Sequence, residues 1–151
     1  MSIVVSNVTK HYGAQKALDD VSFTIPAGEI VGFIGPNGAG KSTMMKIITG
    51  FFPADAGQVT VCGIPAGPAA REMRRFIGYL PENNPLYLDM YVREYLAYVA
   101  DIYSLGRRSR EAVSSVIERT GLTPEQGKKI GALSKGYRQR VGLAQALIHD
   151  P

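Results

Sequence analysis

The chain of 151 residues has a formal net charge of +4, a single cysteine, and a composition that is 45% hydrophobic and 20% charged. Such a composition excludes a disordered or collagen-like chain, and the length is enough for one domain with a buried core. One cysteine excludes an internal disulfide, which fits a reducing cytoplasm, and no apolar run approaches the roughly 20 residues that cross a bilayer. The basic residues are scattered along the chain, so we predict an ordinary basic surface and no nucleic-acid partner.

Five short runs rich in β-formers are predicted to be strands, at residues 2–8, 21–25, 29–34, 58–62 and 76–80. The run 21–25 alternates apolar and polar side chains, which is typical of a half-buried strand. Antiparallel strands that come before a buried strand at 29–34 indicate a small β-subdomain beside an α/β core.

Helices are predicted where apolar residues recur at helical spacing. The expected helices cover residues 42–50, 69–75, 91–105, 108–122 and 134–149. The helix over 91–105 carries apolar side chains at Val92, Leu96, Val99 and Ile102, which would share one face. The helices of the second half therefore indicate a separate α-helical subdomain.

One stretch fits the phosphate-loop pattern G-x-x-x-x-G-K-[ST]: Gly35, Pro36, Asn37, Gly38, Ala39, Gly40, Lys41, Ser42 and Thr43. Its glycines let backbone N–H groups turn inward around phosphates, and Lys41 adds a compact positive charge for the β- and γ-phosphates. Ser42 offers a hydroxyl to Mg²⁺, at the start of a helix whose N-terminus points at the phosphates. A chance glycine-rich turn is the alternative, and the strand and helix predicted on either side argue against it.

A second stretch resembles the signature motif L-S-G-G-Q of ATP-binding cassette (ABC) proteins: Leu133, Ser134, Lys135, Gly136 and Tyr137. Lys135 replaces the first signature glycine and Tyr137 replaces the glutamine. The resemblance covers essentially the whole chain. Residues 77–87 and 133–137 are similar to gliding-motility-type ATP-binding subunits, which belong to the ABC-2-type exporters of bacteria.

The resemblance implies a fold with two parts. We expect an α/β P-loop NTPase (RecA-like) core with an antiparallel β-subdomain over about residues 1–82, and a helical subdomain with the signature helix over about residues 83–151. The acidic pair of the Walker B strand is expected after Pro151, so the C-terminal strands and the catalytic residues are missing from this chain. The core sheet should then keep an unpaired edge and an uncovered apolar face.

The resemblance also assigns roles to single residues. Tyr12 matches the aromatic residue that stacks on adenine, although an exposed loop tyrosine is the alternative. Glu82 stands where the family usually has the Q-loop glutamine; its carboxylate is a candidate Mg²⁺ ligand, and the alternative is a solvated loop acid. Ser134 is expected to face the ATP of a second cassette, or to serve only as a helix N-cap. Lys135 would add positive charge at that phosphate, unless it points to solvent.

The implied function is ATP binding with Mg²⁺ and, in the complete parent, ATP hydrolysis that drives export. The expected partners are a second cassette and transmembrane permease subunits, at the cytoplasmic face of the inner membrane. This chain alone is expected to be inactive as an ATPase. The alternatives are a non-transport ABC protein that acts on DNA or ribosomes, a non-catalytic nucleotide-binding scaffold, and a small kinase or GTPase. A GTPase would need an N-K-x-D guanine motif, which the sequence lacks.

Overall fold

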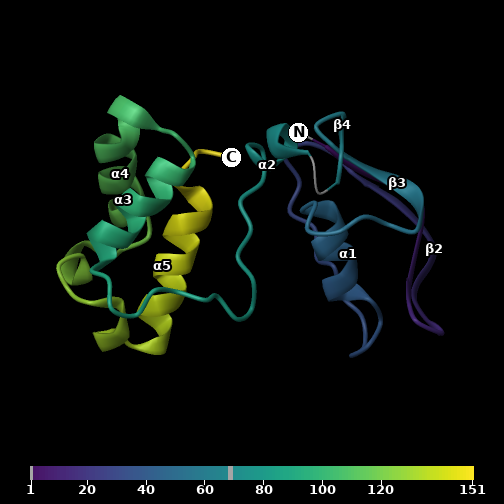
Figure 1. Cartoon of the computed structure of the whole chain (residues 1–151), viewed down its shortest axis with the longest axis horizontal. Helices are drawn as coiled ribbons and strands as arrows, with labels where there is room; N and C mark the ends of the chain where they lie inside the picture. The colour runs from purple at the N-terminus through teal and green to yellow at the C-terminus, as the bar shows by residue number, and fades with distance from the viewer. Residues whose placement is uncertain (1, 68–69) are drawn as a thin grey trace. The chain divides into compact units, whose positions relative to one another are not determined.

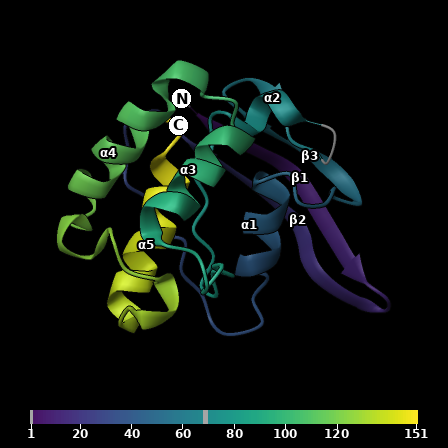
Figure 2. The ribbon, with the colours of Figure 1, turned by 60° about the vertical axis from the view of Figure 1, so that its left-hand side comes forward.

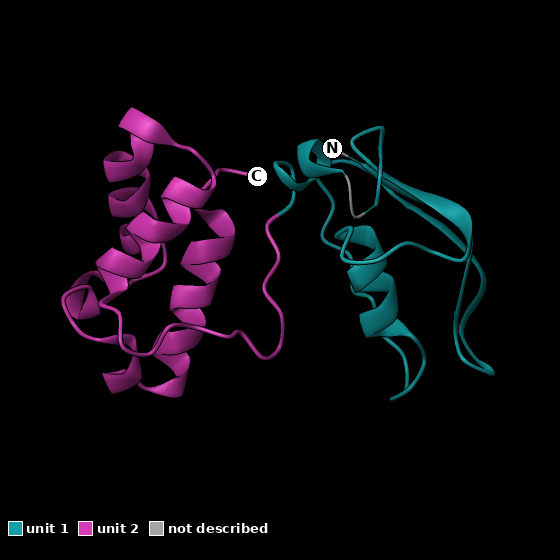
Figure 3. Ribbon diagram, viewed as in Figure 1, with its two compact units in different colours: residues 1–77 teal, residues 78–151 magenta. Residues whose placement is uncertain are grey.

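The computed structural model describes residues 2–67 and 70–151. It divides the chain into two compact units, residues 1–77 and 78–151 (Figure 3). The first unit contains a sheet with one main helix, and the second unit is helical. Each unit has its own hydrophobic core.

The first unit is built on an antiparallel sheet of four strands, in the order β2-β1-β3-β4. The strands are β1, Ile3–Tyr12; β2, Gln15–Ile25; β3, Ala56–Val61; and β4, Ile64–Pro65. The strands β1 and β2 form a long hairpin, visible in Figure 2, in which Tyr12 pairs with Gln15 across the turn. The predicted antiparallel β-subdomain is therefore present, with β1 and β2 longer than the sequence indicated.

Helix α1, Lys41–Ile48, lies alongside this sheet in both Figure 1 and Figure 2. It buries Met44, Ile47 and Ile48 against a core that includes Val5 and Val59 of the sheet. Burying such side chains supplies about 1.5–3 kcal/mol each, so the apolar stripe of α1 fixes the helix to the sheet. The predicted short helix over 69–75 is present as α2, Arg71–Arg74, and residue 69 lies outside the described residues.

The strands predicted at 29–34 and 76–80 do not form, which is a correction to the sequence-based expectation. The run 29–34 is without regular secondary structure, and its Ile30 and Ile34 side chains are almost fully exposed. A strand needs a neighbouring strand for its backbone N–H and C=O groups, and neither run belongs to the sheet that the described residues form. An apolar, β-rich sequence is not sufficient where that neighbour is absent.

The second unit consists of three main helices and short 3₁₀ turns. Figure 1 draws it in green to yellow, the colours of the C-terminal half of the chain. The main helices are α3, Val92–Ile102; α4, Ser109–Arg119; and α5, Lys135–Leu147. The 3₁₀ turns are η1, Gly106–Arg108; η2, Thr123–Glu125; and η3, Ile130–Ala132. The long helices predicted in this half are thus confirmed, each a few residues shorter. No helix among the described residues combines the length and the apolar character that crossing a bilayer requires.

The core of the second unit follows the predicted helical faces with one exception. Val92, Leu96 and Val99 of α3 are buried, and they pack with Val116 of α4 and Val141 of α5. Ile102, predicted on the same face, is 62% exposed. It occupies the last position of α3.

A polar contact joins α3 to α5 within this core. The Tyr95 hydroxyl donates to Oε1 of Gln145 at 2.7 Å, and Nδ2 of Asn84 donates to the same oxygen at 3.4 Å. Burial, with smaller contributions from Tyr87 and Tyr98, raises the pKa of the Tyr95 hydroxyl to about 12. The folded unit therefore favours the protonated phenol more strongly than the unfolded chain does.

We predict that Tyr95→Phe changes how stability depends on pH. Because the pKa of Tyr95 is raised from 10.0 to about 12, its stabilising contribution is complete below pH 10 and is lost as the pH rises toward 12. The free energy of unfolding, measured with urea between pH 8 and 12, should fall more steeply for the unchanged protein than for Tyr95→Phe. The variant should also lose about 1 kcal/mol at neutral pH with the hydrogen bond. Tyr79→Phe, at an exposed tyrosine, is the control; parallel curves for Tyr95→Phe and the unchanged protein would contradict the prediction.

Candidate functional site

The phosphate-loop residues form an open turn that leads into α1. Gly38 and Gly40 have φ values of +83° and +81°, a region in which a side chain is strained. The Lys41 ammonium group donates to the carbonyl oxygens of Gly35 and Pro36, at 2.7 Å each. The loop from Gly35 to Ala39 is exposed along its whole length. The Lys41 ammonium group is thus held by the carbonyl oxygens of an exposed backbone loop.

Ser42 lies in the first turn of α1, and its side chain is exposed. The first N–H groups of a helix have no acceptor within the helix, and the helix dipole places partial positive charge there. The side chain of Ser42 is therefore exposed at the N-terminal end of α1, where the helix carries partial positive charge. Thr43, the last residue of the motif, is half-buried.

Gly40 fixes the loop against the hairpin. A Cβ atom at this position would overlap the carbonyl oxygen of Ala17 and would lie 2.7 Å from Cδ2 of Leu18, both in β2. Leu18 is buried and pairs with Lys10 of β1. The second motif glycine is thus required both for its φ value and for this close approach, which the sequence pattern did not reveal.

Tyr12 is the last residue of β1, close in sequence to the segment of β2 that touches Gly40. Its side chain is 49% exposed. Its ring meets the Phe52 ring edge to face, with centroids 6.2 Å apart and an interplanar angle of 89°. Phe52 is a residue that the sequence analysis missed; its position just after the phosphate-loop helix, beside Phe51, was the available signal.

The signature residues begin α5. Ser134 is the N-cap, with an extended backbone, and its Oγ accepts a hydrogen bond from the Tyr137 N–H at 3.3 Å. Leu133 is buried in the helical core, and Lys135 is exposed. A Cβ atom at Gly136 would meet no atom within 4 Å, so the helix N-terminus is open on that side. The arrangement supports an N-cap role directly and leaves N–H groups accessible to an anion.

Tyr137 takes the place of the signature glutamine, and its side chain is half-buried. The guanidinium carbon of Arg140 lies 5.1 Å from the centre of its ring. Arg140 also donates to the carbonyl oxygen of Gly121 at 3.4 Å. Tyr137 therefore packs within the helical unit, which accounts locally for a large side chain at a position where the motif has an amide.

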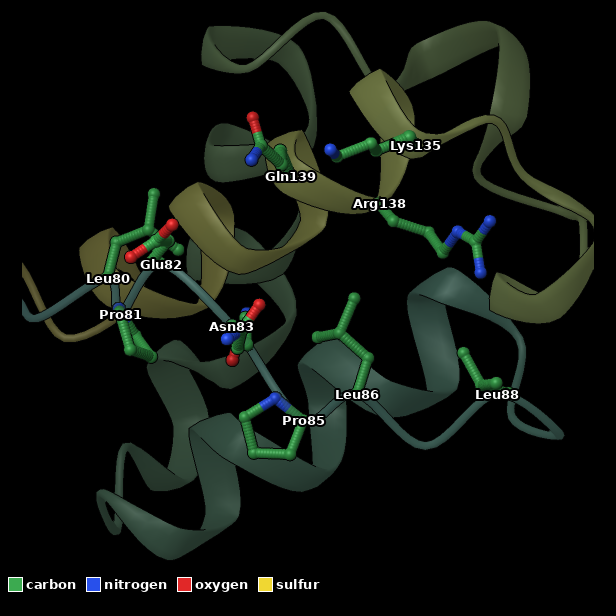
Figure 4. A pocket seen from close by; sticks show the side chains of 11 residues that line it. Leu80, Pro81, Glu82, Asn83, Pro85, Leu86, Leu88, Lys135, Arg138 and Gln139 are labelled. Atoms are coloured by element: carbon green, nitrogen blue, oxygen red, sulfur yellow. The ribbon is translucent and has the colours of Figure 1, made fainter.

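Glu82 lies beside a pocket of about 640 Å³ in the second unit. Figure 4 shows Lys135, Arg138 and Gln139 on α5, with Pro85, Leu86 and Leu88 on the segment across from them. The side chain of Glu82 is exposed. The sequence had not indicated that Glu82 and Lys135 line one pocket, because they are far apart in the chain.

The predicted site residues thus fall into two groups. The phosphate loop and Tyr12 belong to the first unit, whereas Glu82 and the signature belong to the second. Within each unit the structure brings the predicted residues close to partners that the sequence could not identify. In the first unit these are Ala17, Leu18 and Phe52.

We predict that Gly40→Ala destabilises the first unit more than Gly38→Ala does. Both positions have a left-handed φ, which costs a non-glycine residue about 1–2 kcal/mol. Only Gly40 lies against a backbone atom, whereas an added Cβ at Gly38 would meet nothing within 4 Å. Urea unfolding of the two variants should show the larger loss for Gly40→Ala. Equal losses would mean that contact with β2 does not position the loop.

For the signature helix, Ser134→Ala should lower the free energy of unfolding of the helical unit by about 1 kcal/mol, because the cap hydrogen bond is lost. Ser115→Ala, at an exposed position within α4, is the matched control and should have little effect. Thermal unfolding followed by circular dichroism measures both variants. If the two variants unfolded alike, the cap bond would not contribute.

Comparison with known proteins places these features in a family. The ABC transporter family model matches residues 18–151. "Nod factor export ATP-binding protein I" of Rhizobium meliloti (strain 1021) is 40% identical over 152 residues, which cover 100% of this chain and 45% of that protein. "Uncharacterized ABC transporter ATP-binding protein YhcH" of Bacillus subtilis (strain 168) is 36% identical over 151 residues, which cover 97% of this chain and 48% of that protein. The chain therefore spans about half the length of the curated relatives that it matches.

Solved structures agree with this assignment. The structure described as "Structure of ATP binding subunit of ABC transporter" has a TM-score of 0.87 at 30% identity, and the match covers 100% of this chain and 63% of that one. The cbiO1 protein of Clostridium perfringens, described as part of the ABC transporter complex cbiONQ, has a TM-score of 0.86 at 25% identity. The match covers 99% of this chain and 62% of that one. The predicted P-loop NTPase fold class is confirmed. With its phosphate loop, its signature helix and a family match over most of its length, the chain belongs to the ABC transporter ATP-binding family.

Proposed function

We propose that the chain is the ATP-binding and signature portion of the ATP-binding subunit of an exporter. The observation that carries the proposal is the Lys41 ammonium group, held by the carbonyl oxygens of Gly35 and Pro36 at the open start of α1. An incoming triphosphate would replace these carbonyls as partners of the ammonium group. A bound nucleotide therefore exchanges a local contact for a stronger, charge-assisted one.

The proposed ligand is ATP with Mg²⁺. Backbone N–H groups from Asn37 to Thr43 would surround the β- and γ-phosphates, and Ser42 would supply a hydroxyl ligand to the cation. Tyr12 would stack on the adenine, since its half-exposed ring has an edge partner in Phe52 and leaves area for a base. Glu82 is a further proposed Mg²⁺ ligand, supported only by its position in the sequence and its exposed carboxylate.

The proposed partners include a second cassette. Its ATP would meet the start of α5, where Ser134 and the open Gly136 present the positive end of a helix. Lys135 is exposed and would add charge at the same phosphate. Leu133, buried below, would fix the turn, and Tyr137 would support it by packing within the unit. The solved structure described as "Dimeric Structure of MJ0796, a Bacterial ABC Transporter Cassette" supports this arrangement in a related protein; its TM-score is 0.84 at 28% identity, and the match covers 99% of this chain and 70% of that one.

The proposal also includes transmembrane permease subunits, which would place the protein at the cytoplasmic face of the inner membrane. The segment before α3 and the exposed side of α3 carry several large apolar side chains that water does not favour: Tyr87, Leu88, Tyr91, Tyr98 and Ile102. Exposed apolar groups gathered on one element are typical of interaction surfaces. The names of the relatives that export Nod factor support export as the direction of transport. The membrane subunits would select the substrate, so the proposal names none.

Hydrolysis would take place in the complete parent. Phosphoryl transfer needs a residue that positions water and a second carboxylate for the metal, in addition to the phosphate loop. We place both outside this chain, in the Walker B region. The chain alone should therefore bind ATP with Mg²⁺ and not turn it over.

The test uses Lys41→Ala in the purified chain. ATP affinity in the presence of Mg²⁺, measured by titration calorimetry, should fall at least about tenfold, because a charge-assisted contact to the phosphates is lost. Lys46→Ala removes the same charge from an exposed position of α1 and should bind ATP nearly normally. Unchanged affinity in Lys41→Ala would refute the site. Phosphate release that Lys41→Ala abolishes would refute the expectation that the chain alone is inactive.

A further inference from the structure

The end of β1 that carries Tyr12 extends past its neighbour on one side. Pairing between β1 and β3 ends where Thr9 lies opposite Ala56. Lys10, His11 and Tyr12 continue beyond that point and, among the strands of the described residues, pair only with β2. A strand end paired on one side only is held weakly unless another group takes the place of the missing strand.

Asp55 takes that place. Its Oδ2 accepts a hydrogen bond from the His11 backbone N–H at 2.6 Å, and its Oδ1 accepts one from the Lys10 ammonium group at 2.6 Å. Its own N–H donates to the Thr9 carbonyl oxygen at 3.0 Å. The Lys10 hydrogen bond, followed by the His11 backbone bond, lowers the pKa of Asp55, so the carboxylate is charged across the neutral range.

Phe52 completes the contact. The Lys10 ammonium group, bonded to Asp55, lies 5.5 Å from the centre of the Phe52 ring, and the same ring meets Tyr12 edge to face. Phe52 lies in the turn after α1, and the Phe51 N–H before it donates to the Lys46 carbonyl oxygen of α1 at 2.8 Å. The segment between α1 and β3 therefore holds both the backbone next to Tyr12, through Asp55, and the ring of Tyr12, through Phe52.

We propose that Asp55 and Phe52 are positioning residues for the nucleotide base: they hold Tyr12 at the end of β1 with one ring face available for stacking. The proposal rests on the function proposed above, in which Tyr12 stacks on the base. It assigns no contact with the phosphates to either residue. Loss of Asp55 should therefore weaken recognition of the base and leave recognition of the phosphates intact.

The experiment compares two probes on the full chain: ATP with Mg²⁺, and inorganic triphosphate with Mg²⁺, which has no base. Binding of both is measured by titration calorimetry for Asp55→Ala, Phe52→Leu, Tyr12→Ala and the double variant Asp55→Ala with Tyr12→Ala. Asp19→Ala is the matched control, because it removes the same charge and an ion pair, to Lys16, from the same hairpin. Asp55→Asn is a second variant that keeps an acceptor for the His11 N–H. Circular dichroism verifies that each variant is folded.

Tyr12→Ala should lower ATP affinity by about fivefold to a hundredfold, the range for loss of stacking on one base, with triphosphate affinity unchanged. Asp55→Ala and Phe52→Leu should each lower ATP affinity about threefold or more, because part of the stacking contribution is lost, and should leave triphosphate affinity unchanged. In the double variant the loss from Asp55→Ala should vanish, since no ring remains to be positioned. The ATP affinity of Asp55→Asn should lie between those of Asp55→Ala and the unchanged protein.

Two results would overturn the inference while the proposed function stands: equal ATP affinity in Asp55→Ala and Asp19→Ala, or an equal loss for ATP and triphosphate in Asp55→Ala. If Tyr12→Ala left ATP affinity unchanged, the stacking role itself would fail, and the positioning role with it. Failure of the phosphate site would instead be seen as unchanged triphosphate affinity in Lys41→Ala.

Discussion

The close approach of Gly40 to the backbone of β2 is the contact on which the proposed nucleotide site of the first unit depends. Because no side chain intervenes, the start of α1 lies directly against Ala17 and Leu18. Leu18 is paired with Lys10, and Lys10 is bonded to Asp55. A single chain of contacts therefore runs from the phosphate loop to the end of β1, where Tyr12 lies.

In the proposed site, this continuity would let one small unit bind two different parts of a nucleotide. Phosphates are recognised by fixed charge and backbone N–H groups, which require a defined loop conformation. A base is recognised by a flat apolar ring, which requires only an orientation. The loop conformation follows from two glycines and a helix start, whereas the ring orientation follows from Phe52 and from the hydrogen bonds made by Asp55.

In the second unit, a buried helical core holds a helix whose N-terminal end is exposed. Its three main helices bury a contiguous apolar core, and α5 takes part in that core through Val141 and Ala144 while its N-terminus remains accessible. The hydroxyl of Ser134 caps the helix by accepting a hydrogen bond from the Tyr137 N–H. Tyr137 packs against the core of the unit and lies beside the Arg140 guanidinium, so its departure from the signature pattern is accommodated by packing.

The sequence by itself determined the phosphate loop, the signature helix, the family and most of the helices, because these depend on local patterns: glycine spacing, a capping serine and apolar residues at helical intervals. Only the tertiary structure decided whether the runs 29–34 and 76–80 form strands, since a strand depends on a neighbouring strand and neither run belongs to the sheet of the described residues. It also brought Asp55 to the His11 N–H and Phe52 to the Tyr12 ring, contacts that no sequence pattern had indicated. The physical reason is the same in both cases: hydrogen bonds and ring contacts between residues distant in the chain leave no periodic trace in it.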